Sequence, residues 1–497
     1  MNPTPTVLNT FQLRDYNDLD WKKVLTLLIL VALFIRFPFF FRDYVDRDES
    51  TFILMGQSWV DGHLPYTQLW DLKPPITFLY FAIIIKLFGK SFFAIRFFGA
   101  IMVAVTALFT YGITRKVASK KIAFWVAVFC VLFQSLFGSL QGVMSEHICT
   151  FFFVIGIYLV VYKRQWGWYL LAGLLFGCAI MSKLNMAYPV LTLGIYFLSE
   201  GFAKNTLSRS IRNLFFMGIG VMLMVSITAL PYYLQDNLYV WWESIFEAPL
   251  AYSGGKYHSP VKTLPFVFIV LGLLITGFAY KIIDFKTREA QLLTVVIIGI
   301  LLSFMQTGKV NGHYLIQLYP FILIPLGVAF GKLPKLKKSY RPLVIALLFL
   351  IPMESYLEYV NIVSNKIKKG SLYNGEGIDV PNYILKHQLD TKNIFFTEYH
   401  IGYWVLDETP PTKVSIHPSN ITRDELFSDL DNPRNSGMEE LRYIIETIRP
   451  NIVVARKGKT IFDKKLVSYN TYIDAYLEEH YQLMATVGRG LIYQRLE

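Results

Sequence analysis

The sequence predicts a polytopic all-α membrane bundle followed by a C-terminal soluble α/β domain. The 497-residue chain is 54% hydrophobic and has a mean hydropathy of +0.40. Only 17% of its residues are charged, whereas an average soluble protein carries about 25%. The long apolar runs fall within residues 21–360, and residues 361–497 have the composition of a soluble protein. We therefore predict a cytoplasmic N-terminus at 1–20, a transmembrane domain at 21–360 and an external domain at 361–497.

The net charge of +12 does not indicate a nucleic-acid-binding protein. Lys and Arg stand in short clusters between apolar runs, as at Arg115-Lys116 and at residues 335–338. This is the distribution of basic residues on the cytoplasmic side of membrane proteins, not a binding stripe. The three cysteines lie in apolar runs, where a free thiol behaves as a small hydrophobic group. The first apolar run lacks a signal-peptidase pattern, so we expect a retained span.

Apolar runs near the length of about 20 residues that a membrane span requires give eleven predicted spans. They are residues 22–41, 92–114, 122–140, 147–162, 166–182, 186–199, 212–231, 263–281, 290–307, 313–331 and 341–359. A further run, 76–89, is short for a span.

The distribution of basic residues decides how the run 76–89 is interpreted. If this run lies on the membrane surface, the segments that connect the spans on one side of the membrane carry 17 basic residues. The connecting segments on the other side, after the first loop, carry 4. If the run spans the membrane, the basic joints face outward, against the usual rule. We therefore predict an external interfacial helix at 76–89, with the N-terminus inside and the first loop, residues 42–75, outside.

The first loop contains an adjacent acidic pair, Asp48 and Glu49. A partly desolvated carboxylate at a membrane surface suits general-base catalysis on an acceptor hydroxyl, and Glu49 could orient Asp48 or bind a cation. The pair also suits the first turn of a helix at 50–60, where acidic side chains are favourable. Taken alone, the dipeptide indicates the helix start more strongly than the catalytic site.

The first loop ends in Asp71-x-Lys73-Pro74-Pro75. The prolines favour the start of a new helix, and a helix N-terminus beside a Lys is a plausible phosphate site. By spacing alone, a turn with a snorkelling Lys73 explains the pattern better.

Six further predicted site residues lie at the outer ends of later spans. Glu146 and His147 lie at the outer end of the span 147–162, and Lys183 follows the span 166–182. Lys309, His313 and Tyr314 open the span 313–331. Ionisable residues beside apolar runs are costly and usually face a cavity, but each also suits a polar cap or an interfacial anchor.

The remaining segments give less specific signals. The loop 232–262 is rich in aromatic residues, including Trp241 and Trp242, which suit interfacial anchors or sugar stacking. In the tail, NIFFTEY and NIVVARK predict buried strands, MEELRYIIETIRP an amphipathic helix and ATVGRGLIYQRL a closing hairpin. The chain contains no Walker A motif, Rossmann fingerprint or H-E-x-x-H motif.

Together these motifs resemble those of a known family. The Asp-Glu pair after the first span, the D-x-K-P-P segment, a later Glu at a span end, an S-K segment and G-H-Y-x-x-Q-x-x-P occur in the same order as in GT-C membrane glycosyltransferases. The resemblance covers residues 21–360 and is to glycosyltransferase family 39, the dolichyl-phosphate-mannose–protein mannosyltransferase-like group, which is related in kind to the lipid A aminoarabinose transferase.

The resemblance implies inverting sugar transfer from a polyprenyl-phosphate donor to a hydroxyl of a glycan, lipid or protein. By position, it implies that Asp48 is the base and Glu49 its neighbour, and that Lys73 and Lys183 bind the donor phosphate. Asp71, Glu146, His147, Lys309, His313 and Tyr314 would line the cavity; relatives often carry Arg, Lys or His at the position of His313. We predict no cofactor, although the Asp-Glu pair is compatible with a divalent cation.

The expected location is the bacterial cytoplasmic (inner) membrane, with lipids as its surroundings and the active site external. A transporter or flippase of a lipid-linked precursor is the alternative function. It predicts internal repeats and charges within the spans; we find no clear repeat, and the charges cluster at span ends.

Overall fold

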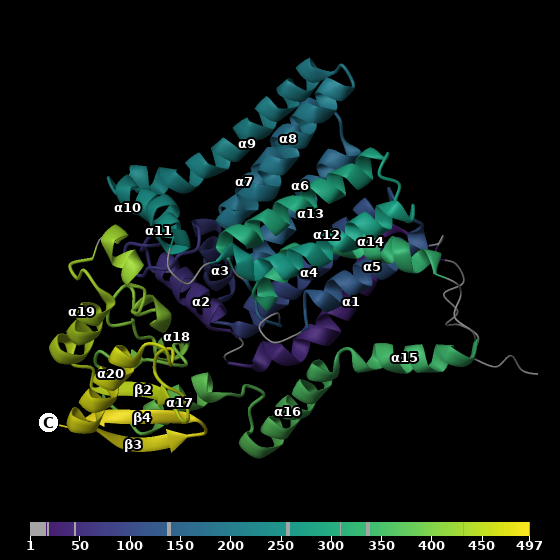
Figure 1. Ribbon diagram of the computed structural model, residues 1–497. Helices are drawn as coiled ribbons and strands as arrows, with labels where there is room; N and C mark the ends of the chain where they lie inside the picture. Colours follow the sequence, from purple (N-terminus) through teal and green to yellow (C-terminus); the bar gives the residue numbers. More distant parts are fainter. Residues whose placement is uncertain are drawn as a thin grey trace, which may run out of the picture.

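A computed structural model describes residues 16, 19–43, 46–136, 141–254, 259–308, 310–333, 338–430 and 432–496. The helices between residues 21 and 369 form one bundle, and the residues from 376 onward form a compact domain at one end of it (Figure 1). The predicted site residue Lys309 lies outside the described residues.

The first half of the bundle contains both long helices and short connecting ones. Asp20 caps the first of them by accepting a hydrogen bond from the amide of Lys23 (2.8 Å). The elements are α1 Trp21–Arg36, η3 Phe37–Phe41, α2 Arg47–Val60, α3 Pro75–Phe88, α4 Phe92–Thr114, α5 Lys120–Phe133, α6 Ser145–Tyr162, α7 Trp166–Ile180, η5 Leu184–Met186 and α8 Ala187–Ala203.

The second half of the bundle continues with a long helix and ends with a bent pair. The elements are α9 Leu207–Tyr233, α10 Leu238–Trp242, the π-helical η6 Glu243–Glu247, α11 Ala248–Gly254, η7 Pro260–Thr263, α12 Leu264–Ala279, α13 Arg288–Thr307, η8 Gly312–Gln317, α14 Tyr319–Lys332, η9 Lys338–Tyr340, α15 Arg341–Leu350 and α16 Met353–Lys369. The last two helices run along one edge of the molecule (Figure 1).

Each of the eleven apolar segments identified in the sequence contains a helix. Within the described residues, six helices are long and apolar enough to cross a membrane, or seven if the α15–α16 pair, bent by 52°, is one span. Helices α3, α7 and α14 are apolar but shorter. The run predicted as a surface helix is α3, whose 14 residues extend about 21 Å at 1.5 Å per residue, less than the hydrocarbon core of a bilayer. The predicted polytopic helical bundle is confirmed.

The C-terminal domain is built around a four-stranded sheet of order β1-β2-β4-β3. Strand β1 pairs parallel with β2, and the other pairs are antiparallel. The elements are α17 Glu376–Lys386, β1 Phe395–Phe396, α18 Gly402–Leu406, η10 Pro418–Asn420, η11 Asp424–Asp429, α19 Gly437–Arg442, the π-helical η12 Tyr443–Ile448, β2 Ile452–Arg456, α20 Val467–His480, β3 Tyr481–Val487 and β4 Gly490–Arg495. The two predicted strands, the helix and the hairpin are thereby confirmed.

The two faces of this sheet belong to different cores. Phe395 and Val453 pack with Leu441 of α19 and Ile473 of α20. Their neighbours along the strands point to the opposite face, as the period of two requires. Phe396, Val454 and Ile492 pack into a core that also contains Phe52 of α2, Phe78 of α3 and Trp70 of the first loop. A single hydrophobic core therefore joins the domain to the first loop.

Backbone pairing also fixes the end of the bundle at which the domain lies. Asn374 donates its amide to the carbonyl of Phe41 and accepts from the amide of Asp43, both at 3.0 Å. These bonds place the start of the domain beside the end of the first helical segment. The predicted domain boundary at 360/361 falls inside α16, so the polypeptide leaves the bundle only after Gly370.

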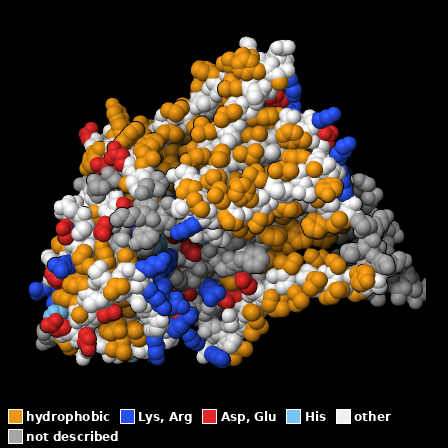
Figure 2. Space-filling view, in the orientation of Figure 1, with side chains coloured by type: hydrophobic (Ala, Val, Ile, Leu, Met, Phe, Trp, Pro, Cys, Tyr) orange, Lys and Arg blue, Asp and Glu red, His pale blue; other side chains and the backbone are white. Residues whose placement is uncertain are grey.

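The surface divides in the same way as the fold. Hydrophobic side chains cover the visible side of the bundle, whereas charged side chains are dense over the C-terminal domain and the adjoining end of the bundle, with further Lys and Arg at the opposite end (Figure 2). This segregation is expected where one part of a chain faces lipid and the other faces water.

Candidate functional site

Helix α2 places the acidic pair at its N-terminus. Asp46 caps the helix by accepting a hydrogen bond from the amide of Asp48 at 2.8 Å. Asp48 and Glu49 lie in the first turn, where the helix dipole favours negative charge. Successive helical residues point about 100° apart, so the two carboxylates face different surroundings.

Asp48 lies between cations from two other parts of the chain. Its Oδ2 is 3.4 Å from Nζ of Lys73, and its Oδ1 is 3.8 Å from Nε2 of His417 in the C-terminal domain. Its side chain remains 27% exposed. Burial raises the pKa of Asp48, but Lys73 foremost, with His417, outweighs burial and holds this pKa below its usual range. Asp48 is therefore ionised at neutral pH and accessible to a ligand.

Lys73 is held by the turn that precedes α3. Its carbonyl accepts a hydrogen bond from the hydroxyl of Tyr66 at 2.6 Å, and its ammonium lies 5.5 Å from the centre of the Phe52 ring. Burial lowers the pKa of Lys73, but Asp48 and Asp71 raise it above its usual value. The nearby Asp71 is 5% exposed, and burial raises its pKa although Lys73 opposes the shift. Lys73 is thus protonated at neutral pH.

A second carboxylate–lysine pair is built from α6 and the joint that follows α7. Glu146, 1% exposed, pairs with Lys183 and lies 3.8 Å from Nε2 of His313. Its other oxygen accepts a hydrogen bond from Ser145 at 3.0 Å. The Lys183 ammonium also lies 4.1 Å from the centre of the Tyr314 ring. The structure therefore brings together four predicted residues from three separate segments.

The N-terminus of α3 joins the two pairs. Ile76 donates its amide to the carbonyl of Met181 at 3.0 Å, and the Thr77 hydroxyl donates to the carbonyl of Ser182 at 2.8 Å. These bonds tie the turn of Lys73 to the segment of Lys183. Asp48 consequently interacts electrostatically with Lys183 as well as with Lys73. Two lysines and the amino ends of α3 and α6 converge here, an arrangement that favours an anion.

Glu49 has a different environment from Asp48. Its carboxylate accepts two hydrogen bonds from Arg96 of α4, at 3.2 and 2.6 Å, and one from the amide of Val143 at 2.8 Å. Both side chains of the ion pair are at most 1% exposed. A Cβ atom at Gly142 would lie 3.0 Å from the Glu49 carboxylate, so the chain there passes directly over it. Glu49 joins α2, α4 and the segment before α6.

A buried arginine fixes the same segment from the other side. Arg36 donates to the carbonyls of Gln134, Gln141 and Gly142 at 3.1, 3.1 and 2.6 Å. Both ring nitrogens of His147 also contact backbone, with Nδ1 accepting from the amide of Met144 at 3.1 Å and Nε2 lying 2.8 Å from the carbonyl of Gln134. The ring nitrogens of His147 therefore contact the backbone of Gln134 and Met144 rather than the two carboxylate–lysine pairs.

Sequence reasoning missed three residues of this region: Arg36, Arg96 and His417. The arginines had a usable signal, because a charge inside an apolar run is costly and marks a functional or structural site. His417 had none, since it stands in an unremarkable stretch of the tail, and only the docking of the domain brings it to Asp48. Among the described residues, no group of three or more His, Cys, Asp or Glu side chains could hold a metal ion.

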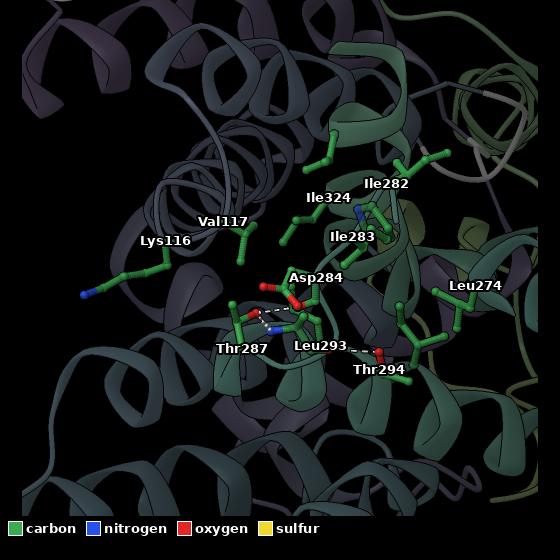
Figure 3. A pocket seen from close by; sticks show the side chains of 14 residues that line it. Lys116, Val117, Leu274, Ile282, Ile283, Asp284, Thr287, Leu293, Thr294 and Ile324 are labelled. Atoms are coloured by element: carbon green, nitrogen blue, oxygen red, sulfur yellow. Dashed lines mark hydrogen bonds between the residues drawn. The ribbon is translucent and has the colours of Figure 1, made fainter. Parts of the chain in front are cut away.

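A separate cavity of about 170 Å³ lies far from these residues. It is lined by the joint after α4, including Lys116 and Val117, and by the α12–α13 joint (Figure 3). Within it, Thr287 donates its hydroxyl to the carbonyl of Asp284 at 2.8 Å. Arg96, which contacts Glu49, precedes Lys116 by 20 residues, or about 30 Å of helix. The cavity therefore belongs to the opposite end of the bundle.

Comparison with known families gives a match to part of the chain. Residues 72–232 match the family model described as dolichyl-phosphate-mannose-protein mannosyltransferase. The match includes Lys73, Glu146 and Lys183, whereas Asp48 precedes it. An uncharacterised protein of Aquifex aeolicus is 25% identical over 262 residues, which are 51% of this chain and 59% of that protein. The chain thus spans about three fifths of the length of this curated relative.

Solved structures match almost the whole chain. ArnT from Cupriavidus metallidurans in the apo state has a TM-score of 0.61 and 12% sequence identity, covering 96% of this chain and 98% of that one. The same protein bound to undecaprenyl phosphate has a TM-score of 0.58 and 13% identity, with the same coverage. The predicted fold, a polytopic helical bundle with a C-terminal α/β domain, is confirmed, and it is similar to the fold of ArnT.

Proposed function

We propose that this GT-C membrane protein transfers a sugar, with inversion, from a polyprenyl-phosphate donor to an acceptor hydroxyl. The observation that carries the proposal is the pairing of Asp48 with Lys73 beside the pair of Glu146 with Lys183. One accessible carboxylate and two lysines at a single level suit a base and an anion site. The matched mannosyltransferase family and the ArnT complex with undecaprenyl phosphate support a lipid-phosphate donor.

The chemistry requires one base and no separate acid. The acceptor oxygen attacks the anomeric carbon while Asp48 takes the hydroxyl proton. The bond between the anomeric carbon and the phosphate oxygen breaks, and the bonding pair leaves with the polyprenyl phosphate. That leaving group is already anionic, so Lys73 and Lys183 can stabilise the charge that builds on it.

Substrate binding also changes the state of the base. In this structure Lys73 contacts Asp48, which lowers its basicity. A donor phosphate that attracts Lys73 would weaken this contact, and the Asp48 carboxylate would become a stronger proton acceptor. In the same way, the phosphate would compete with Glu146 for Lys183.

We place the site at the outer face of the bacterial cytoplasmic membrane. The acidic first loop and the C-terminal domain lie at one end of the bundle. The clusters of basic residues lie in the alternate connections between the predicted spans, such as the one that contains Arg115 and Lys116. Basic joints favour the cytoplasmic side. The lipid chain of the donor would remain in the bilayer, with its phosphate at headgroup depth beside the lysines.

The decisive experiment compares wild type with Asp48→Asn in proteoliposomes that contain a radiolabelled polyprenyl-phosphate sugar. Membranes of the native host with the gene deleted supply the acceptor. We expect Asp48→Asn to lose at least about 100-fold of the transfer rate, since a general base contributes about 10²–10⁴-fold. Asp61 is an exposed carboxylate at the other end of α2. The control variant Asp61→Asn should therefore transfer sugar at the wild-type rate.

The outcomes separate the proposed reaction from its alternative. Label that moves into the acceptor fraction only when Asp48 is intact supports the transferase. An Asp48→Asn protein that transfers at the wild-type rate would contradict the assignment of the base. Label that changes leaflet without joining an acceptor would instead indicate a flippase.

A further inference from the structure

The C-terminal domain contributes one side chain that reaches the carboxylate of Asp48. His417 precedes the short helix η10, and its Nε2 lies 3.8 Å from Oδ1 of Asp48. The opposite oxygen, Oδ2, lies 3.4 Å from Lys73. Each oxygen of the proposed base is therefore matched to one partner, and the His417 side chain is only 10% exposed.

The local structure of the domain determines which nitrogen of His417 carries the proton. The amide of Ser419 donates to Nδ1 at 3.2 Å, and the Ser419 hydroxyl lies 2.7 Å from the same atom. An Nδ1 that accepts from an amide carries no proton, so the neutral ring bears its proton on Nε2. Burial lowers the pKa of His417 well below its usual value, which keeps the ring neutral. The N–H group thus faces Asp48.

The segment that carries His417 is fixed to the first loop. The amide of Trp70 donates to the carbonyl of Lys413 at 2.9 Å, and the side chain of Asn420 donates to the carbonyl of Trp70 at 3.5 Å. Trp70 itself is buried and donates its indole N–H to Ser244 at 3.1 Å. Hydrogen bonds through Trp70 therefore join the loop that bears Lys73 to the segment that bears His417.

We propose that His417 is a positioning residue for Asp48 and that the active site is complete only when the C-terminal domain is docked. The neutral imidazole directs its Nε2–H to Oδ1, which leaves the other oxygen to Lys73 and, once the donor binds, to the acceptor hydroxyl. A separation of 3.8 Å is long for a hydrogen bond, and such contacts often tighten when substrate binds. The proposal rests on the proposed function of Asp48.

The contact has a defined effect on pH dependence. Asp48 also interacts electrostatically with other titratable groups, which are Lys73, Lys183, His313, Asp71 and His400, with Asp46 and Glu49 beside it on α2. His417 is itself faced by His400, Arg423 and Arg47. A donor to Oδ1 stabilises the carboxylate, so its removal raises the pKa of Asp48. Because the base must be ionised, the acid limb of the activity profile then moves to higher pH.

The first test measures kcat/KM against pH for wild type, His417→Ala and His417→Gln. We expect His417→Ala to lose about tenfold in rate, equivalent to one hydrogen bond to a charged group, and to shift its acid limb upward. His417→Gln, whose amide can donate from near the Nε2 position, should restore both. His387→Ala, an exposed histidine of the same domain, is the matched control. A His417→Ala protein with the wild-type profile would overturn the proposal.

The second test does not depend on activity. In protein with ¹⁵N-labelled histidine, the Nε2 resonance assigned by its loss in His417→Gln should change in Asp48→Asn and stay unchanged in Asp61→Asn. An unaltered resonance in Asp48→Asn would overturn the contact. If the resonance responds but no protein transfers sugar, the proposed function fails and the contact between the domain and Asp48 stands.

Discussion

Adjacent residues with the same charge serve different purposes in this protein. Asp48 is 27% exposed and contacts Lys73, whereas Glu49 is 1% exposed and is paired with an equally buried arginine, Arg96. Both residues belong to the catalytic site that the sequence predicts. The contacts instead support chemistry for Asp48 and a packing role for Glu49, because a carboxylate with three donors has little capacity left for a substrate.

This distinction predicts that Glu49→Gln acts on stability. Removing one partner of a buried ion pair leaves an uncompensated charge and costs about 3–5 kcal/mol. We therefore expect a large fall in the melting temperature of detergent-solubilised protein. The double variant Glu49→Gln/Arg96→Met should recover part of the loss, since it removes both charges. A single variant as stable as wild type would show that the pair contributes little.

Lys183 should affect donor binding more than the chemical step. A lost contact between an ammonium and a phosphate costs about 1.5–3 kcal/mol, so we expect Lys183→Met to raise the KM for the donor by at least about tenfold. The same change leaves Glu146 buried without its partner. The double variant Lys183→Met/Glu146→Gln separates the effects, because it should regain stability but not affinity. An unchanged KM in both variants would remove Lys183 from the donor site.

At the scale of elements, the site depends on how closely α2 approaches α3. A Cβ atom at Gly56 of α2 would lie 2.6 Å from Cβ of Phe81 and 2.9 Å from the amide nitrogen of Ala82, so the two helices are in contact through their backbones there. Helix α2 carries Asp48 at its start, and α3 begins just after Lys73. The separation of the base from the lysine is therefore set in part by a residue with no side chain.

Gly56→Ala should consequently destabilise the protein by about 1–3 kcal/mol, the usual cost of overpacking. It should also lower the transfer rate, because α2 must shift. Gly272→Ala in α12 is the control, since no atom lies within 4 Å of its added Cβ and alanine favours a helix. The melting temperature of each variant decides the question, and equal values for the two would contradict the close approach.

At the scale of the whole molecule, the first loop and the C-terminal domain form one body. They share a hydrophobic core and backbone hydrogen bonds. Arg47 of α2 also pairs with Glu398 of the domain, and Trp404 donates its indole N–H to Gln57 at 3.0 Å. Whatever side of the membrane one of them occupies, the other occupies it too.

The proposed topology predicts which residues react with a membrane-impermeant maleimide in whole spheroplasts. Lys457→Cys, exposed on the C-terminal domain, should be labelled, and Arg115→Cys, exposed at the end of α4, should be labelled only after the membrane is opened. The charge distribution gives this expectation. The unsubstituted protein, whose Cys130 and Cys149 are buried, supplies the background. The reverse labelling pattern would invert the topology.

The sequence determined the features that depend on local composition. Apolar run length placed a helix in each of the eleven segments, and the alternation of strands and turns predicted the sheet of the tail. Local pattern suffices here because the length of an apolar run, its periodicity and its capping residues are properties of neighbours in the chain. The distribution of basic residues between the spans also predicted that Asp48, Lys73, Glu146, Lys183 and His313 lie on one side of the membrane.

Only the tertiary structure decided which charges pair. Glu49 meets Arg96 across 47 residues, and His417 meets Asp48 across 369. No periodicity in the sequence records such contacts, because they depend on how helices and domains pack. The sequence therefore determined that this protein is a membrane bundle with a polar end. The packing of the C-terminal domain on the first loop decided which of the acidic neighbours remains open to a substrate.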